Sequence, residues 1–183
     1  MRAGFRRCQT KTGIQAFTKN FAPVKKSAVR QVILQQLQQE LARQSNAAQM
    51  ARDEAVSEES RAQNKWDTHS QEAAYLAEGQ AKLAAEIGAS IELYATLPLP
   101  DFAAGDVIAL GAVVEIESAD GASAWFFIGP RSGGMEVEVD GQSLNVLTPQ
   151  SPLGRQLIGK KAGDEVRVTS RGAPAVQRIR SVR

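Results

Sequence analysis

Residues 27–61 carry apolar side chains at helical spacing and contain neither glycine nor proline. Large side chains and then alanines recur at Ile33, Leu34, Leu37, Leu41, Ala48, Ala51 and Ala55. Apart from the adjacent pair Ile33 and Leu34, they are separated by three, four or seven positions. This pattern predicts a helix from Ser27, its N-cap, to about Arg61. A second helix is predicted from about Ser70 to Tyr94. Its inward side is expected at Leu76, Leu83, Ile87 and Ile91.

The two predicted helices favour an antiparallel hairpin over residues 27–96. A polar stretch at residues 62–69 lies between them and is predicted to be a turn. At 1.5 Å per residue, helices of about 35 and 25 residues would be about 50 and 40 Å long. Leu and Ile gather at one end of their seam and Ala at the other. The hairpin is therefore expected to be anchored at its base and to protrude at its tip.

The pattern changes to period two beyond the linker, residues 97–104, because Pro98 and Pro100 end the second helix. Short alternating runs predict strands at residues 107–110, 112–116, 124–128, 135–139, 144–147, 165–168 and 176–179. Asp-Gly and Gly-Gly pairs between them are typical of turns. A short helix is expected at residues 151–160, with Ser151 at the N-cap and Pro152 at the first helical position. The fold class is α+β, a helical hairpin followed by a mostly antiparallel β domain that is expected to fold alone.

Composition narrows the class of protein. The net charge is +2, but seven of the 22 basic residues and none of the 20 acidic ones lie in residues 1–26, so residues 27–183 carry about −5. An acidic body argues against a protein whose main task is to bind phosphate backbones. The single cysteine, Cys8, excludes an internal disulfide and a Cys-rich zinc site, and it favours a reducing, cytoplasmic setting. No apolar stretch approaches the roughly 18 residues of a membrane helix.

The basic N-terminal segment, residues 1–26, has no apolar region of the kind found in secretory signals. A transit peptide, a nucleic-acid-binding arm, and a disordered lead-in or misplaced start codon all fit its composition. We assign no function to it. Its removal is expected to leave folding nearly unchanged, because it lacks periodic apolar residues.

One motif of the β domain is specific, namely Ser151-Pro-Leu-Gly-Arg-Gln-Leu-Ile-Gly-Lys-Lys-Ala-Gly-Asp-Glu-Val166. It closely resembles the signature of the Gre transcript-cleavage factors, in which Ser-Pro opens a short helix and Gly-Asp starts the next strand. Ile108-Ala-Leu-Gly-Ala-Val-Val114 is similar to the first strand of the same family domain. The likeness covers about residues 105–182 and continues more loosely over residues 27–96. It implies an FKBP-like domain at residues 105–183 that docks on RNA polymerase, with Ser151, Pro152 and Arg155 as binding residues.

The resemblance places chemistry at the hairpin tip. In Gre factors an Asp and a Glu three residues apart help to hold a second Mg²⁺ in the polymerase active centre, which speeds hydrolysis of backtracked RNA. With Tyr75 as the anchor, these positions fall on Thr68 and Gln71, which cannot replace carboxylates. Asp67 and Glu72 each lie one residue away and are the candidate metal-holding residues. The chain would have no cofactor of its own and would share Mg²⁺ with RNA polymerase.

Trp66 and His69 are candidate binding residues in the same stretch. A tryptophan in a polar turn favours either contact with a partner or packing across the hairpin end. His69 is the only histidine, so a His-rich metal site and a His-based triad are excluded. It is expected to be solvated or to touch nucleic acid or polymerase.

The sequence is compatible with three classes of function. The first is an accessory elongation factor, not itself an enzyme, that binds bacterial RNA polymerase as a monomer and contacts the nascent RNA indirectly. With its altered tip, such a factor would stimulate RNA cleavage or only inhibit or modulate the polymerase. The second is an adaptor whose coiled coil dimerises or binds another helical protein. The third, a prolyl isomerase, needs an aromatic-lined pocket, and Trp125, Phe126 and Phe127 are too few for one.

Overall fold

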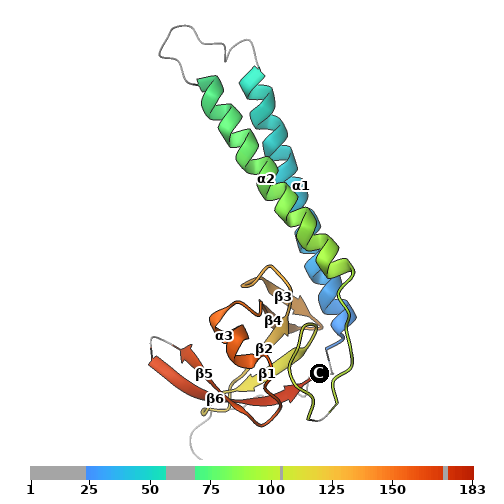
Figure 1. Ribbon diagram of the computed structural model, residues 1–183, viewed down its shortest axis with the longest axis vertical. Helices are drawn as coiled ribbons and strands as arrows, with labels where there is room; N and C mark the ends of the chain where they lie inside the picture. The colour runs from blue at the N-terminus through green and yellow to red at the C-terminus, as the bar shows by residue number, and fades with distance from the viewer. Residues whose placement is uncertain (1–23, 57–68, 104, 171–172) are drawn as a thin grey trace, which may run out of the picture.

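The computed structural model describes residues 24–56, 69–103, 105–170 and 173–183. A helical hairpin, formed by α1 (Lys26–Val56) and α2 (His69–Ala95), rises from a β domain of six strands and one short helix (Figure 1). This architecture confirms the predicted α+β class. The turn was predicted at residues 62–69, but its last residue, His69, already belongs to α2. Residues 62–68 of this turn and the last residues of the first predicted helix, 57–61, lie outside the described residues. No helix in the described part of the chain is long and apolar enough to cross a membrane.

The first helix begins slightly earlier than the sequence predicts. The carbonyl of Lys25 accepts hydrogen bonds from the backbone N–H groups of Ala28 and Val29, at 2.9 and 3.1 Å. Ser27 therefore lies inside the first turn and is not the N-cap. Val24 is buried, so the folded part of the chain includes the last residues of the basic segment. The second helix ends at Ala95, before the prolines of the linker, as predicted.

The two helices meet along small side chains in the outer half of the hairpin. The buried residues of this seam are Ala48, Ala51 and Ala77. In contrast, the side chains of Leu76 and Leu83 are 56% and 47% exposed, so the prediction that they face inward is wrong. Consecutive helix positions differ by about 100° around the axis, and the small alanine next to Leu76 lets the two helices approach more closely. Nearer the base, Ile87 and Ile91 pack against the core, as predicted.

The β domain is built on one mixed sheet in the order β3-β4-β2-β1-β6-β5. Its strands are β1 (Val113–Glu117), β2 (Ser123–Ile128), β3 (Glu136–Val139), β4 (Gln142–Leu147), β5 (Glu165–Ser170) and β6 (Ala173–Val182). All neighbouring strands are antiparallel except β2 and β4, which run parallel. Asp140 and Gly141 form the turn between β3 and β4, and both have the positive φ values, 53° and 75°, that a two-residue hairpin turn of type I′ requires.

The strand predicted at residues 107–110 does not form. This segment pairs with the chain that follows the short helix, through two backbone hydrogen bonds. Ile108 donates to the carbonyl of Lys160 at 2.7 Å, and Gly159 donates to the carbonyl of Ile108 at 3.0 Å. An alternating apolar pattern therefore produced an extended segment with too few partners to form a ladder.

The short helix, α3 (Pro152–Leu157), begins as the sequence predicts and ends three residues before the predicted limit at residue 160. The Ser151 hydroxyl accepts a hydrogen bond from the Gly154 N–H at 3.0 Å, which makes Ser151 the N-cap. Pro152 occupies the first helical position, where a missing N–H has no intrahelical partner to lose. Gly159 follows the helix with a φ of 81°, a left-handed conformation that suits glycine.

The sheet separates two layers of buried side chains. Successive residues of a strand point to opposite faces. Val113 and Phe127 accordingly face the hairpin, whereas Val114 and Ile128 belong to the layer covered by Leu157 of α3. The hairpin contributes its base to the first layer through Val29, Ile33, Leu37 and Tyr94. The hairpin and the sheet therefore share one core.

Candidate functional site

The predicted docking residues of the β domain lie on and beside α3. The Ser151 hydroxyl is already engaged within the fold, since it caps α3 and donates to the Thr148 carbonyl at 2.8 Å. Pro152 and Arg155 are exposed on the same helix. Ser151 therefore positions the helix, while Pro152 and Arg155 are available to a partner.

Three exposed apolar side chains lie where the segment 107–110 meets the end of α3. Val107, Leu110 and Ile158 are 55%, 40% and 38% exposed. The backbone pairing of Ile108 with Gly159 and Lys160 brings them into one region of the surface. The sequence did not predict this apolar surface, because its pattern assigned residues 107–110 to a buried strand.

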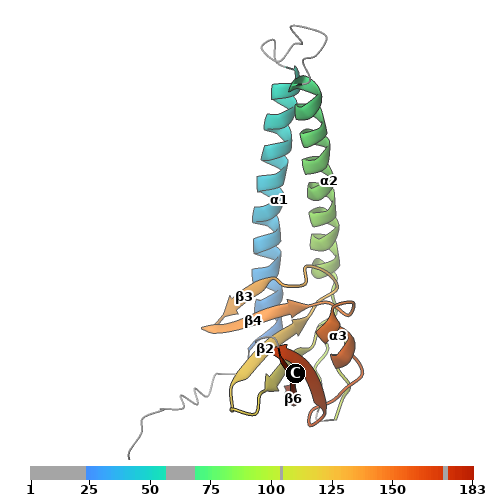
Figure 2. The ribbon, with the colours of Figure 1, turned by 90° about the vertical axis from the view of Figure 1, so that its left-hand side faces the viewer.

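Of the predicted tip residues, His69 and Glu72 lie at the end of the hairpin away from the β domain. Trp66 and Asp67 fall outside the described residues. His69 is the first residue of α2, and Glu72 is exposed in the first helical turn. A carboxylate in that turn interacts favourably with the helix dipole, which accounts for Glu72 without any metal. The start of α2, with His69 and Glu72, is therefore separated from Ser151, Pro152 and Arg155 by the length of the hairpin (Figure 2).

No group of three or more His, Cys, Asp or Glu side chains that could hold a metal ion occurs among the described residues. Near the described end of the hairpin, Asp53 accepts a hydrogen bond from the Gln49 side chain at 2.7 Å, and Glu72 stands on the other helix. Mg²⁺ takes about six oxygen ligands in a regular octahedron. The described tip residues do not supply such a set.

Large apolar side chains are exposed on the outer half of the hairpin. Met50 is 72% exposed and Tyr75 is 74% exposed, in addition to Leu76. In the sequence analysis, Tyr75 served only to align the hairpin tip with the family motif. Exposed apolar groups on a protruding element are typical of a surface that contacts a partner.

The base of the hairpin is fixed to the β domain by Tyr94. Its ring is fully buried, and its hydroxyl donates to the carbonyl of Arg131 at 2.7 Å. Burial raises the pKa of Tyr94 well above its usual value, and the hydrogen bond to Arg131 acts in the opposite direction. The hydroxyl is thus a proton donor at any physiological pH.

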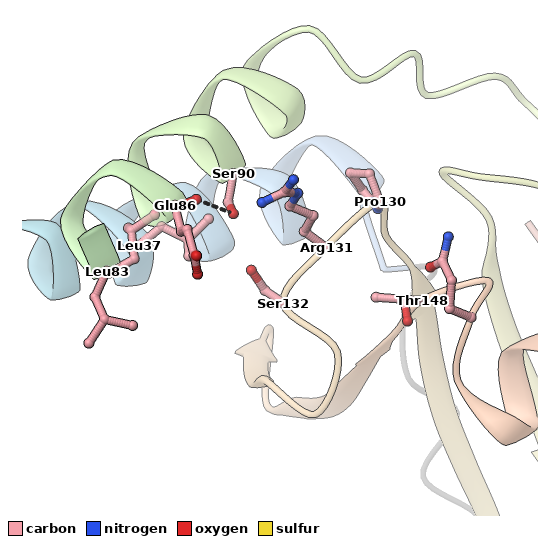
Figure 3. A pocket seen from close by; sticks show the side chains of 10 residues that line it. Leu37, Leu83, Glu86, Ser90, Pro130, Arg131, Ser132 and Thr148 are labelled. Atoms are coloured by element: carbon pink, nitrogen blue, oxygen red, sulfur yellow. Dashed lines mark hydrogen bonds between the residues drawn. The ribbon is translucent and has the colours of Figure 1, made fainter. Parts of the chain in front are cut away.

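A cleft of about 480 Å³ opens beside this junction (Figure 3). Its lining comes from both parts of the molecule and comprises Leu37, Leu83, Glu86, Ile87, Ser90, Pro130, Arg131, Ser132, Thr148 and Gln150. Ser90 uses its hydroxyl within α2, donating to the carbonyl of Glu86 at 2.9 Å. The cleft leaves one side of the hairpin base without packing against the β domain.

Residues 103–183 match a family model described as the C-terminal domain of the transcription elongation factors GreA/GreB. Comparison with curated proteins gives no match. Among solved structures, the chain is similar to GreA factor homolog 1 (Gfh1) of Thermus thermophilus, with 20% identity, 82% of this chain and 94% of that one covered, and a TM-score of 0.37. For Gfh1 of Thermus aquaticus the identity is 22%, the coverage 87% and 96%, and the TM-score 0.37.

Proposed function

We propose that this protein is a Gre-like factor that binds RNA polymerase and reaches into its secondary channel with the helical hairpin, because residues 103–183 match the family model of the GreA/GreB C-terminal domain. It would act as an accessory protein in the cytoplasm, through the active centre of the polymerase, and as a monomer. The observation that carries the proposal is the joining of this domain to a hairpin that projects from it.

The shape of the hairpin supports insertion into a narrow passage. With 31 residues in α1, the hairpin extends about 46 Å at 1.5 Å per residue. Its outer half stands clear of the β domain (Figures 1 and 2). Because only two helices packed through alanines make up this part, it is thin.

Docking is assigned to the surface around α3. Pro152 is exposed at the start of α3 and Arg155 in its last turn, and the exposed apolar side chains of Val107, Leu110 and Ile158 lie where the helix ends. An apolar centre with an arginine at its margin is typical of protein–protein contacts. This assignment keeps the hairpin free to extend away from the docked domain.

Arg155→Glu is expected to weaken binding to core RNA polymerase at least about tenfold, since reversing a charge at a docking surface replaces attraction by repulsion. The measurement is competition of the unlabelled variant with labelled full-length protein. Arg178→Glu, at an exposed arginine of β6, is the matched control and should bind as the wild type does. Equal weakening by both substitutions would show a general charge effect and would contradict the docking assignment.

The tip decides whether the factor stimulates RNA cleavage. Mg²⁺ held by the polymerase would act as a Lewis acid that activates the attacking water, and carboxylates of the tip would add oxygen ligands to it. The positions expected to carry these carboxylates hold Thr68 and Gln71, while Asp67 and Glu72 flank them. This altered order also favours a second candidate function, a factor that occupies the channel and modulates the polymerase without cleavage.

If Asp67 and Glu72 act together on the metal, replacing either by alanine should abolish stimulated cleavage and leave polymerase binding unchanged. Raising the Mg²⁺ concentration should restore part of the activity, because mass action offsets weaker binding. Glu78→Ala, at an exposed carboxylate further along α2, is the control and should keep full activity.

A wild-type protein that binds polymerase but stimulates no cleavage at any Mg²⁺ concentration would instead support the modulator. In that case Thr68→Asp combined with Gln71→Glu should create cleavage activity. Continued inactivity of this double variant would mean that the hairpin does not reach the active centre, and channel insertion would be rejected.

A further inference from the structure

Tyr94 lies in the last turn of α2, where the hairpin meets the sheet. It belongs to the same core layer as Ile33 of α1 and Phe127 and Val146 of the sheet, and none of its surface is exposed. The hydroxyl crosses this layer to reach the Arg131 carbonyl at 2.7 Å. One side chain therefore connects the base of the hairpin to the chain that follows β2.

Gly129 leaves the space through which the Tyr94 hydroxyl passes. A Cβ atom on Gly129 would lie 2.1 Å from that hydroxyl oxygen, 3.0 Å from the Cζ of Tyr94 and 3.1 Å from a methyl group of Val146. Gly129 itself is held by the sheet, because its N–H donates to the carbonyl of Leu147 at 2.8 Å. The close contact is thus made with the central strands of the sheet, where the backbone cannot shift easily.

The exposed polar contacts across the junction are weaker determinants of direction than the buried bond of Tyr94. Lys26 donates to the carbonyl of Pro100 and forms an ion pair with Asp101 at 3.5 Å, but the side chain of Asp101 is fully exposed. Gln36 donates to the carbonyl of Glu136 at 3.3 Å, and this bond is also exposed. Exposed bonds exchange readily with water and contribute little net stability.

The consequence of a loose junction grows with the length of the hairpin. A tilt of about 10° at the base would move the end of a helix about 46 Å long by about 8 Å. The cleft beside Ser90 and Arg131 offers room for such a tilt on one side (Figure 3). A displacement of that size would take a tip out of reach of a target only a few ångströms wide.

We propose that Tyr94, seated on Gly129 and bonded to the Arg131 carbonyl, sets the direction of the hairpin relative to the β domain and thereby positions the tip. Tyr94 is a positioning residue, far from any group that would react. The direction of the hairpin is a property of the chain itself, while its consequence for polymerase rests on the proposed function.

The direction can be measured with two spin labels in a Cys8→Ser background, one at Met50→Cys on the outer hairpin and one at Glu138→Cys on β3. Both sites are exposed. Tyr94→Phe removes only the hydroxyl and should broaden the distance distribution or shift its mean by about 5 Å or more, by the same lever. Tyr75→Phe is the same chemical change at a residue that is 74% exposed and should leave the distribution unchanged. An unchanged distribution in Tyr94→Phe overturns the proposal.

Gly129→Ala tests the same contact from the other side. The alanine methyl should displace the Tyr94 hydroxyl and change the distribution more than Tyr94→Phe does. In the double variant the 2.1 Å clash is gone, so its distribution should lie closer to that of Tyr94→Phe than to that of Gly129→Ala. Strictly additive changes would mean that the two residues do not act as one contact, and the proposal would fail.

A control is needed that lowers the stability of the protein without changing the contact between Tyr94 and Gly129. Val166→Ala makes a cavity in the other core layer, and it should leave the distances unchanged although it lowers the melting temperature. A change of distances in Val166→Ala as large as in Tyr94→Phe would overturn the positioning role.

In assays with RNA polymerase, Tyr94→Phe should bind with unchanged affinity and lose the effect that the hairpin tip has on the polymerase. Altered distances combined with an unaltered effect on polymerase would contradict channel insertion, not the role of Tyr94.

Discussion

Gly154→Ala is expected to destabilise the protein by more than about 3 kcal/mol, enough to unfold much of it at 37 °C. Gly154 is buried in α3, directly over the turn that precedes the helix. A Cβ atom there would lie 1.9 Å from the carbonyl oxygen of Thr148 and 2.7 Å from the hydroxyl of Ser151. The first of these atoms belongs to the backbone, so the overlap cannot be relieved by turning a side chain.

The same substitution would also disturb the start of the helix. The Gly154 N–H donates to the Ser151 hydroxyl at 3.0 Å, and this hydroxyl donates onward to the Thr148 carbonyl at 2.8 Å. Moving α3 away from the turn to accommodate a methyl group would break the cap, whose loss is typically worth about 1 kcal/mol. It would also withdraw Leu157 from the core layer that α3 covers.

Denaturant unfolding followed by circular dichroism measures the effect. Gly79→Ala and Gly88→Ala are the matched controls, because both glycines lie inside α2 and a Cβ atom on either meets nothing within 4 Å. They should raise the free energy of unfolding by about 0.5–1 kcal/mol each, since alanine restricts the unfolded chain more than glycine does. A Gly154→Ala protein as stable as these controls would refute the close packing of α3 on the Thr148 turn.

A fragment of residues 98–183 is expected to lack a cooperative unfolding transition, contrary to the expectation that the β domain folds alone. One face of its sheet is completed by the base of the hairpin. Removing the hairpin would expose the apolar residues Val113, Phe127, Val137, Leu144 and Val146. Burial of a large apolar side chain contributes about 1.5–3 kcal/mol, so the loss should exceed roughly 5 kcal/mol, comparable to the whole stability of a small domain.

The matched control is a fragment of residues 24–183, which keeps the buried Val24 and both described helices. It should melt within a few degrees of the full chain. Calorimetry and binding of a hydrophobic dye distinguish the two fragments, since an uncovered sheet face should bind the dye. If residues 98–183 melted cooperatively near the melting temperature of the full chain, the shared core would contribute little to stability. The expectation that the β domain folds alone would then be correct.

Features set by neighbouring residues were predictable from the sequence. The order Ser151, Pro152 and Gly159 determines where α3 starts and stops, because a cap, a preset φ and a left-handed glycine act within one helical turn. Asp140 and Gly141 specify the β3–β4 turn for a similar reason. The family resemblance rested on the same local motif and was confirmed for residues 103–183.

The inward face of α2 was predicted less well. Periodicity predicts which side of a helix is apolar. It does not decide which of two adjacent stripes faces the partner helix when one carries leucines and the other alanines. The structure buries Ala77 and leaves Leu76 exposed, since the close approach of α1 favours the smaller side chain. The distance at which a partner helix packs cannot be deduced from the spacing of residues in one segment.

The sequence by itself determined the hairpin, the linker, the strand-rich domain and the ends of α3, since each depends on residues within a few positions of one another. Only the tertiary structure decided that the hairpin and the sheet share a core and that β2 pairs in parallel with β4. It also decided that Tyr94 meets Gly129. These two residues are 35 positions apart, and neither is informative alone, because a helical tyrosine and a glycine after a strand are both common. Their meeting depends on the path of the whole chain between them, which local spacing does not encode.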